Sequence, residues 1–459
     1  MGETIDVTSA VVRGRPSLVE RMRTRSLTLD LLVVSVVSLA LGLVRLGSPP
    51  LWVDEAYTYE QLQKGYLDQF DGYMPFYYWI EKPWTELAGT SEWAMRFPSV
   101  LGAMLASALV VVLARKLFDD RVALVSGLLL ATSPYFVKWS QQARAYPFLA
   151  AAAIVATLLL LRALERDGRA AWALYGLAFT GLLMTHAVAG LLLAPAHAVL
   201  VLRRRQRAMP HCLLACAIIL AFGVTWVAQL AMRTRGPTSE TAWIPFPSAA
   251  YVRGSLLGIS GAAGVGLVLA LFGLWALWRA RERDLPLWLG SWAFGPFVFA
   301  LLISFARPVF VDRYLVVAAP AFAMLAAVGL TSLAGRIRTG ATLAVVVATC
   351  FGLVLWYQTT LKGNWRGEDW RAAASFVQSR TGGDVVAVPW WTHNESDYYG
   401  LQARDTATAD SVWLLSWSEH GHELSASQRQ PLGLADHELV ETREFGWRLT
   451  AQLWRRPSP

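Results

Sequence analysis

Residues 314–333 read YLVVAAPAFAMLAAVGLTSL, a run of twenty residues without a charged side chain. A helix that crosses a bilayer needs about 20 such residues, because in hydrocarbon only the helix itself can satisfy its backbone amides. Directly before this run stands RPVFVDR, residues 307–313, which places two arginines and an aspartate at its start. The stretch therefore predicts a transmembrane helix with charged groups at one membrane surface.

Similar apolar runs recur through most of the chain. Of its 459 residues, 55% are hydrophobic and 16% are charged, whereas a soluble domain carries about a quarter charged residues. The sequence therefore predicts a polytopic α-helical membrane protein. We expect about eleven transmembrane helices, with the fifth and sixth joined by a tight turn around His186; they lie near residues 29–46, 95–114, 121–137, 146–161, 171–186, 187–202, 211–231, 254–278, 285–304, 314–333 and 341–358.

The distribution of basic residues predicts the orientation of these helices. Cytoplasmic loops of membrane proteins carry an excess of Lys and Arg, and here every alternate connection is basic. We expect on the cytoplasmic side the residues Arg13, Arg15, Arg21, Arg23, Arg25, Arg115, Lys116, Arg121, Arg162, Arg166, Arg169, Arg203, Arg204, Arg205, Arg207, Arg279, Arg281, Arg283, Arg336 and Arg338. The N-terminus is then cytoplasmic and the C-terminus lies outside. The cell membrane is the expected location.

Three domains follow from this topology. Residues 1–28 form a cytoplasmic tail rather than a signal peptide, because the first apolar run begins only near Leu29. Residues 29–358 form the transmembrane domain and include a first external loop at 47–93. Residues 359–459 are more polar and predict a small external α/β domain, in which 370–380 has helical spacing and 385–388, 412–415 and 445–453 resemble strands.

Charge and cysteine content exclude several other classes. The formal net charge of +8 does not indicate a nucleic-acid partner, because the arginines form short clusters between apolar runs. The three cysteines, Cys212, Cys216 and Cys350, lie in apolar stretches, so no disulfide framework is expected. No GxGxxG or Walker pattern follows a predicted strand, which disfavours a nucleotide-sugar donor.

The first external loop carries adjacent acids at the membrane surface. It begins LWVDEAYTYE at residues 51–60, with Asp54 and Glu55 among aromatic side chains. Such carboxylates could deprotonate an alcohol or hold a divalent cation, although two solvated acids would give the same pattern. Asp71 and Tyr73 follow in an aromatic stretch, where rings could anchor at the headgroups or stack on sugars. Arg96 stands at the start of the second span and could extend to the surface.

Two other external turns carry arginines against the general bias. Arg144 lies in KWSQQARAYPF, and Arg313 lies in the RPVFVDRY turn. An outward arginine beside a span needs an anionic partner, which could be a phosphate or a carboxylate of the protein. His186 at the outer end of a span could be a structural hydrogen bonder. His393, in WWTHNESDYYG, could contact an acceptor.

Taken together, these motifs resemble the type C glycosyltransferases, in the bacterial branch related to protein O-mannosyltransferases and the lipid A aminoarabinose transferase. The resemblance runs from about Leu51 to Pro320. It rests on WVDE at 52–55, DGYMPFYYWI at 71–80 with SEWAMRFPS at 91–99, WSQQARAY at 139–146, and RPVFVDRYLVVAAP at 307–320.

The resemblance implies the chemistry and the residues that perform it. A polyprenyl-phosphate sugar would be the donor, attacked with inversion at the anomeric carbon from the outer face. Asp54 would be the base, with Glu55 supporting it or sharing a Mg²⁺ or Mn²⁺ ion, and Asp71 would correspond to a second acid. Arg144 with Tyr146, and Arg313 with Tyr314, would bind the lipid phosphate. The supporting or acceptor-binding residues would be Asp71, Tyr73, Arg96, His186 and His393.

The sequence departs from its relatives at two positions. They usually have His-Pro-Pro or Lys-Pro-Pro where this chain has Tyr73, Met74 and Pro75, and they tend to have Glu where Gln142 stands. Both changes remove a charged or titrating group.

These observations favour an inverting glycosyltransferase that moves mannose or arabinose from a polyprenyl phosphate to a glycan, glycolipid or protein acceptor. The main alternative is a transporter or flippase of a lipid-linked substrate, which should place charges at mid-bilayer in broken helices. A third interpretation, a scaffold around the external domain, leaves Asp54, Glu55 and the two arginine turns without a shared purpose.

Overall fold

A computed structural model describes residues 26–71, 73–203, 209–233, 244–281, 283–361, 363–380, 382–389, 392–418 and 424–457. The part of the predicted tail up to residue 25, with its five arginines, lies outside the described residues, as do Arg204, Arg205 and Arg207. The chain forms two compact units. Unit 1 comprises Met1–Val44, Leu67–Ile80 and Phe97–Leu353, and unit 2 comprises Arg45–Tyr66, Glu81–Arg96 and Val354–Pro459.

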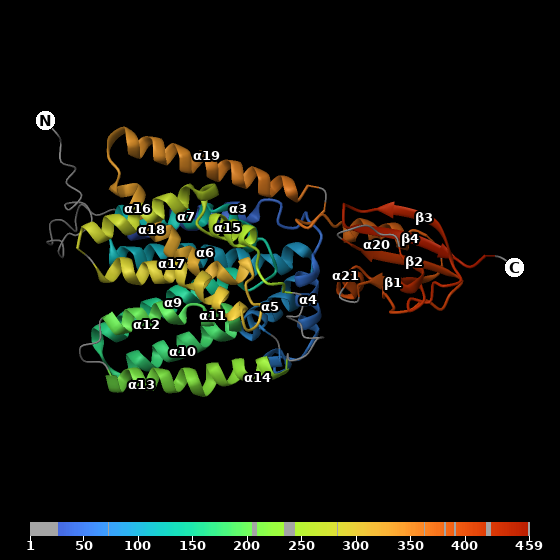
Figure 1. Ribbon diagram of the computed structural model, residues 1–459, viewed down its shortest axis with the longest axis horizontal. Helices are drawn as coiled ribbons and strands as arrows, with labels where there is room; N and C mark the ends of the chain where they lie inside the picture. The colour runs from blue at the N-terminus through green and yellow to red at the C-terminus, as the bar shows by residue number, and fades with distance from the viewer. Residues whose placement is uncertain are drawn as a thin grey trace. The chain divides into compact units, whose positions relative to one another are not determined.

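Unit 1 is a bundle of helices, most of which lie side by side in Figure 1. Three helices, α5, α6 and α19, contain a boundary between the two units. The helices are α3 (Leu27–Leu43), η1 (Asp68–Asp71), α5 (Pro75–Ala88), α6 (Glu92–Leu117), α7 (Asp120–Thr132), α8 (Pro134–Ser140), α9 (Tyr146–Arg166), α10 (Arg169–Thr185), α11 (Ala187–Leu191), α12 (Ala194–Arg203), α13 (Met209–Ile218), η2 (Ile219–Val224), α14 (Thr225–Arg233), α15 (Ala249–Ile259), η3 (Ala262–Gly264), α16 (Val265–Arg279), α17 (Asp284–Ser304), η4 (Asp312–Ala318), α18 (Ala319–Ser332) and α19 (Gly335–Thr359).

Within the described residues, seven helices are long and apolar enough to cross a membrane, or eight if α7 and α8 form one span bent by 59°. The predicted multi-pass helical architecture is therefore present. The count of eleven stays a prediction, because three expected spans correspond to shorter helices. These are α3 and α10, with 17 residues each, and the pair α11 and α12, with 5 and 10 residues.

Two expected spans are interrupted by proline or glycine residues, whose effect on the backbone does not appear in a hydropathy pattern. The span expected at 121–137 bends where Pro134 begins α8, because proline disfavours helical backbone at the residue before it. The span expected at 254–278 is broken between α15 and α16. There Gly261 and Gly264 adopt φ angles of 83° and 93°, which glycine tolerates without strain.

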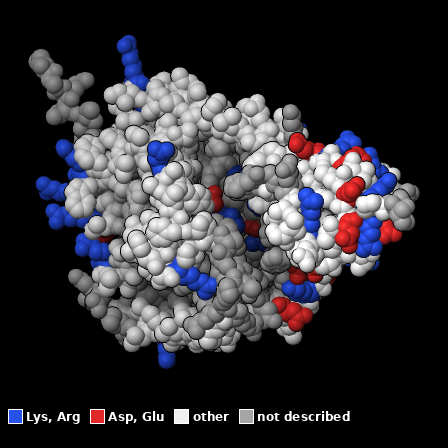
Figure 2. All heavy atoms as spheres, turned by 45° about the vertical axis from the view of Figure 1, so that its right-hand side comes forward, with Lys and Arg blue, Asp and Glu red and all other residues white. Residues whose placement is uncertain are grey.

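The centre of unit 1 is formed by η4 and α18. In this segment 89% of the apolar window is buried, compared with 17% in α19 and 17% in the run His211–Gln229 of α13, η2 and α14. The apolar side chains of α19 therefore lie on an outer surface of the unit, as expected of a helix that faces lipid. Figure 2 shows largely uncharged atoms over the helices and many acidic and basic side chains over the strand-containing part.

Unit 2 contains a four-stranded sheet with short helices. The strand order is β1-β2-β4-β3, in which β1 pairs with β2 in parallel and the other pairs are antiparallel. The elements are α4 (Val53–Gln63), α20 (Trp370–Gln378), β1 (Asp384–Val388), α21 (His393–Tyr398), β2 (Ser411–Trp417), α22 (Ala426–Arg429), β3 (Glu438–Glu444) and β4 (Leu449–Arg455).

Alternating side chains of the central strands bury both faces of this sheet. Trp413 and Leu415 pack with Trp370 of α20 in one cluster, whereas Val412 and Leu414 belong to the other. The strands expected at 385–388 and 412–415 coincide with β1 and β2. The strand expected at 445–453 corresponds to β4, which begins only at Leu449 because Phe445 to Arg448 form the turn before it, and β3 was not expected at all. This edge strand is mostly charged and exposed, which protects a sheet edge but gives no hydrophobic alternation.

The contact between α16 and α18 generates a prediction about stability. A Cβ atom on Gly329 would overlap the carbonyl oxygen of Leu269, and one on Gly273 would overlap that of Leu325. Close approach through small residues is the usual basis of helix packing in membranes. We expect Gly329→Ala to destabilise the protein by roughly 1–3 kcal/mol, measured as a lower melting temperature in detergent.

Gly340→Ala in α19 is the matched control, because a Cβ atom there meets nothing within 4 Å. Its melting temperature should stay the same or rise slightly, since alanine favours helix over glycine. An equal effect of the two substitutions would contradict the close packing of α16 on α18.

Candidate functional site

The motif WVDE begins helix α4 in unit 2. Trp52 precedes the helix, and Asp54 and Glu55 occupy its first turn. Carboxylates are favoured there because the first backbone N–H groups of a helix point toward them. Asp54 is partly exposed, and its backbone carbonyl accepts a hydrogen bond from the Thr58 hydroxyl at 3.1 Å. A partly exposed carboxylate at a helix start can accept a proton from a bound alcohol.

Glu55 is buried in an ion pair with Arg96. Arg96 Nε and Nη2 each donate to a different oxygen of the Glu55 carboxylate at 2.7 Å. The same guanidinium donates to the backbone carbonyls of Leu46, Pro49 and Pro50 at 2.8 to 3.1 Å. Arg96 therefore does not extend to the surface but fixes the start of the loop against α4.

This arrangement bears on the expected divalent cation. Both oxygens of Glu55 are bonded to Arg96, and the described residues contain no group of three His, Cys, Asp or Glu side chains that could hold a metal ion. The described residues therefore do not fit a cation held by Asp54 and Glu55, and the steps proposed below involve none.

Helix α21 packs beside α4 within unit 2. The ring of Tyr398 lies edge-on to Tyr59 of α4 at 5.0 Å between centroids. The Tyr399 hydroxyl accepts from the backbone N–H of Leu51 at 2.8 Å and donates to Glu92 at 3.1 Å. Arg371 of α20 also binds Glu92, at 2.6 Å. These contacts fix the segment that contains Asp54.

His393 and Glu395 occupy the first turns of α21. His393 Nε2 lies 3.1 Å from the Ala387 carbonyl of β1, so it donates a hydrogen bond to the sheet. Glu395 is fully buried, and neither of its carboxylate oxygens has a hydrogen-bond partner among the described residues. Burial raises its pKa well above the ordinary value, and the nearby acids Glu368 and Asp54 raise it further. The surroundings of Glu395 therefore favour its protonated form.

The expected phosphate-binding residues come together in unit 1. Arg144 lies in the turn between α8 and α9, Tyr146 begins α9, and Arg313 and Tyr314 lie in η4. His186 is at the centre of the group: its ring lies 4.4 Å from that of Tyr314 and 6.1 Å from that of Tyr146, centroid to centroid. The positive charges of Arg144 and Arg313 both act on the His186 ring. Three turns distant in sequence thus form one cationic group.

The backbone around this group is held by specific hydrogen bonds. The Ser99 hydroxyl donates to the Arg144 carbonyl at 2.9 Å. The Tyr135 hydroxyl donates to the Asp312 carbonyl at 2.8 Å, and the Tyr251 hydroxyl donates to the Asp312 carboxylate at 3.2 Å. Arg144 and Arg313 are only 8% and 9% exposed. Two nearly buried guanidinium groups are a strong attractor for an anion with several oxygens.

Histidine 186 itself acts as a neutral structural group. Its Nδ1 accepts a hydrogen bond from the Ala189 backbone N–H at 3.4 Å at the start of α11. Tyr73 packs on a hydrophobic cluster formed by Trp226 and by Ala187, the residue that follows His186. Asp71 ends η1, and its side chain lies outside the described residues.

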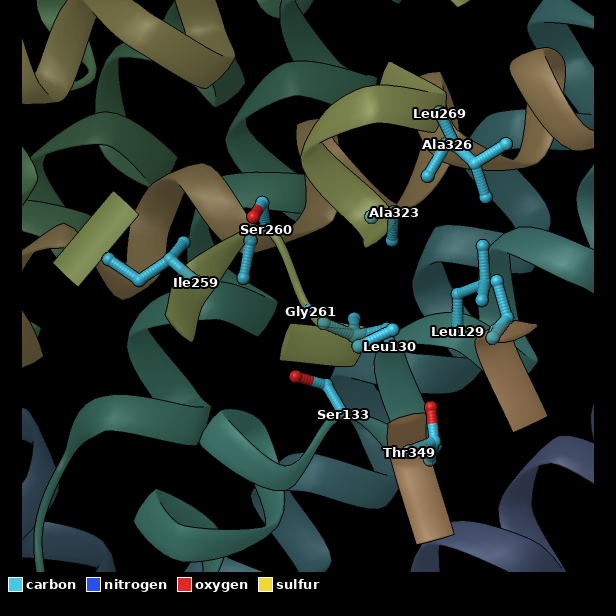
Figure 3. Close-up of a pocket in the computed structure, with 14 residues that line it drawn as sticks. Leu129, Leu130, Ser133, Ile259, Ser260, Gly261, Leu269, Ala323, Ala326 and Thr349 are labelled. Atoms are coloured by element: carbon cyan, nitrogen blue, oxygen red, sulfur yellow. The ribbon is translucent and has the colours of Figure 1, made fainter. Parts of the chain in front are cut away.

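A separate apolar cavity lies in unit 1. Figure 3 shows its lining from α7, α15, α16, α18 and α19, with hydroxyl groups but no charged side chain. Its lining offers no acid, base or cation. The labelled lining residues are Leu129, Leu130, Ser133, Ile259, Ser260, Gly261, Leu269, Ala323, Ala326 and Thr349.

The predictions from the sequence missed two residues of interest, Glu395 and Lys138. Glu395 stands in the same aromatic motif as His393, so the motif was the available signal, but burial is invisible in sequence. Lys138 was the other: its charge acts on Asp312 and Arg313, and its ammonium lies 4.5 Å from the centroid of the Trp139 ring. Its signal was a lysine in KWSQQARAYPF, a turn that was expected to be external.

Comparisons with known proteins agree with the expected family resemblance. Residues 73–228 match the family model described as dolichyl-phosphate-mannose-protein mannosyltransferase. This segment contains Tyr73, Arg144, Tyr146 and His186. A comparison with curated proteins finds no match.

Solved structures match over nearly the whole chain. ArnT from Cupriavidus metallidurans in the apo state superposes with a TM-score of 0.65 at 18% identity, covering 93% of this chain and 98% of that one. ArnT bound to undecaprenyl phosphate gives 0.61 at 17% identity, covering 92% and 97%. The apo oligosaccharyltransferase of Archaeoglobus fulgidus gives 0.55 at 13% identity, covering 82% and 64%. The fold is therefore shared with these proteins, and the resemblance predicted from the sequence is confirmed.

The buried acid Glu395 generates a prediction about pH. Below about pH 4.3, the ordinary glutamate pKa, the side chain is protonated in folded and unfolded protein alike. As pH rises, the unfolded chain ionises first, so stability is lost until pH passes the raised folded pKa. Glu395→Gln cannot ionise. Its melting temperature should match wild type near pH ~4 and exceed it increasingly toward pH ~8.

Glu438→Gln on the exposed strand β3 is the control and should leave the pH dependence unchanged. The melting temperatures of wild type and both variants, measured on purified protein between these pH values, test this pH dependence. A Glu395→Gln variant less stable than wild type at every pH would show that the carboxyl group makes bonds that folding requires.

Proposed function

We infer that this protein is a membrane-embedded glycosyltransferase whose sugar donor is a polyprenyl phosphate. The observation that carries this conclusion is the convergence of Arg144 and Arg313 on His186, from turns that only the folded bundle brings together. The family match over 73–228 and the shared fold support the same class. A donor that is already a sugar phosphate needs only a base for the acceptor and positive charge for the leaving group.

We assign the steps as follows. Asp54 accepts the proton of the acceptor hydroxyl. The acceptor oxygen attacks the anomeric carbon, and the bond from that carbon to the phosphate oxygen breaks. The phosphate leaves with the bonding electrons, and Arg144 and Arg313 stabilise its growing negative charge. Attack from the face opposite to the leaving group inverts the anomeric centre. Tyr146 and Tyr314 hold His186 beside the phosphate.

Glu55 and Arg96 act by positioning in this scheme. Their buried ion pair sets the first turn of α4, so Asp54 is directed by a rigid neighbour rather than by a mobile loop. Glu55 thus supports the base without taking the proton itself. Tyr73, Asp71 and His393 remain candidates for supporting or acceptor contacts.

The orientation in the membrane follows from charge and from contacts. Lys116 binds Glu165 at 2.8 Å, and Arg203 binds Asp284 at 2.9 Å, so each ion pair joins two of the connections that are expected to be cytoplasmic. We place these connections in the cytoplasm, since basic loops are retained there. The N-terminus is then cytoplasmic, and residues 359–459 lie outside the plasma membrane as an α/β domain. Eleven spans satisfy this arrangement.

The sugar and acceptor are narrower proposals. Mannose is favoured by the description of the matched family, and arabinose by the resemblance to the aminoarabinose transferase branch. A glycan, a glycolipid or a protein on the outer face would supply the acceptor hydroxyl.

A transporter of a lipid-linked substrate is the second candidate. The bend between α7 and α8 and the break between α15 and α16 are the kind of interrupted helices that transporters use. The cavity lined by these segments contains no charged side chain, however, whereas transporters bind substrate charge at such breaks. This difference favours the enzyme.

The proposed base gives the first functional prediction. Asp54→Asn keeps the size of the side chain but removes its proton acceptor, so turnover should fall about 100-fold or more while donor binding is retained. Transfer from radiolabelled donor and binding of polyprenyl phosphate are measured on the same preparation. Glu60→Gln, an exposed change on the same helix, is the control and should remain active. Near-normal turnover of Asp54→Asn would move the role to another acid.

The arginine pair gives the second functional prediction. Lysine keeps the charge but cannot bind two phosphate oxygens with a planar fork. Arg144→Lys and Arg313→Lys should therefore weaken both donor binding and turnover, with a melting temperature close to that of wild type. Arg162→Lys at an exposed position of α9 is the control. A variant that loses stability but binds polyprenyl phosphate normally would assign that arginine to a structural ion pair.

A further inference from the structure

Tryptophan and arginine side chains alternate along one side of unit 2. Arg448 lies 3.9 Å from the ring centroid of Trp447 and 5.6 Å from that of Trp417. Arg366 lies 5.1 Å from the centroid of Trp417 and 5.8 Å from that of Trp52. The five residues form a continuous row, which we call the Trp–Arg row. It is independent of the residues assigned above to catalysis and phosphate binding.

The inner end of the row reaches the catalytic helix. Trp52 is 2% exposed and stands directly before α4, two positions from Asp54. Its ring also contacts Trp365 edge-on, at 5.1 Å between centroids. Arg366 also forms an ion pair with Glu368, with 3.4 Å between Arg366 Nε and Glu368 Oε1. The row therefore ends beside the helix that carries the proposed base.

The outer end of the row is open to solvent. Trp447 is 61% exposed, although indole rings are usually buried. It lies in the turn between β3 and β4, where its backbone N–H donates to the Gly367 carbonyl at 3.0 Å. A Cβ atom on Gly367 would overlap the Trp447 ring, so this ring rests directly on backbone. The exposed ring is thus held in a fixed orientation.

We propose that the Trp–Arg row is the binding site of the acceptor and that this acceptor is an uncharged saccharide chain. An indole face packs against the C–H face of a sugar ring, and a guanidinium donates hydrogen bonds to its hydroxyl groups. Next to the turn that carries Trp447, the end of β3 exposes Arg443 and Glu444, whose opposite charges favour a neutral ligand there over an anionic glycan or an anionic lipid surface. The saccharide contacts the exposed end of the row at Trp447, and the buried Trp52 connects the row to α4.

This proposal names the acceptor class of the proposed enzyme. It rests on the proposed function only in treating the bound saccharide as an acceptor. Binding of a saccharide to the row does not require that transfer occurs, so the two claims fail separately. The test uses purified full-length protein with mannohexaose as the probe. Saccharide binding is measured by saturation-transfer NMR, and transfer by the KM and kcat for the probe as acceptor.

Trp447→Ala should weaken mannohexaose binding about tenfold or more and raise the acceptor KM, with kcat and polyprenyl phosphate binding unchanged. Trp447→Phe keeps an aromatic face and should recover much of the affinity. Val440→Ala, an exposed change on β3, should behave as wild type. Saccharide binding lost in Trp447→Ala, in a protein without any transfer activity, would support the row and overturn the glycosyltransferase assignment.

Unchanged saccharide affinity in Trp447→Ala would overturn the proposal. Activity lost only in liposomes, with normal saccharide binding in detergent, would also overturn it and assign Trp447 to the membrane surface. A Trp447→Phe variant no better than Trp447→Ala, with the melting temperature of wild type, would argue against stacking on an aromatic face.

Discussion

The guanidinium group of Arg96 is bonded to two carboxylate oxygens of Glu55 and to the carbonyls of Leu46, Pro49 and Pro50. All of these groups are buried or nearly so, and each would cost free energy if left without a partner. Breaking a buried pair of this kind typically costs about 3–5 kcal/mol. The interaction fixes the loop after the first helix and, with it, the direction of α4. The placement of Asp54 depends on it, as does the segment to which α20 and α21 attach.

The two proposed tasks of the protein have different electrostatic requirements. A base must be reachable by the acceptor, and Asp54 is partly exposed at the start of a helix. A leaving phosphate requires positive charge held away from water, and Arg144 and Arg313 are nearly buried around a neutral histidine. In unit 2, burial raises the pKa of Glu395 and favours its protonated form, which limits the negative charge that acts on Asp54.

Much of this arrangement was predictable from particular residues. Apolar runs located the helices, and Arg144 and Arg313 marked two turns that come together at His186. Interruptions at Pro134 and Gly261 were not predicted, because average hydropathy does not register backbone geometry. Strand β3 was missed because it is an exposed edge.

The partners of buried polar groups could not be read from sequence. Arg96 and Glu55 are 41 positions apart, so nothing local indicated their pairing. Likewise Glu395 looked like any helical glutamate, and the Trp–Arg row joins residues from four distant segments. Such contacts depend on tertiary packing, which a single sequence specifies but does not display.

The central claim is that sugar leaves a polyprenyl phosphate for an acceptor, and one measurement tests it most directly. Purified protein in liposomes is given polyprenyl phosphate carrying radiolabelled mannose or arabinose, together with envelope extract as the source of acceptor. The account predicts that label leaves the lipid phosphate and appears in a glycan, glycolipid or protein with the anomeric configuration inverted. Label that stays on the polyprenyl phosphate but moves to the opposite leaflet would contradict the account and establish a transporter.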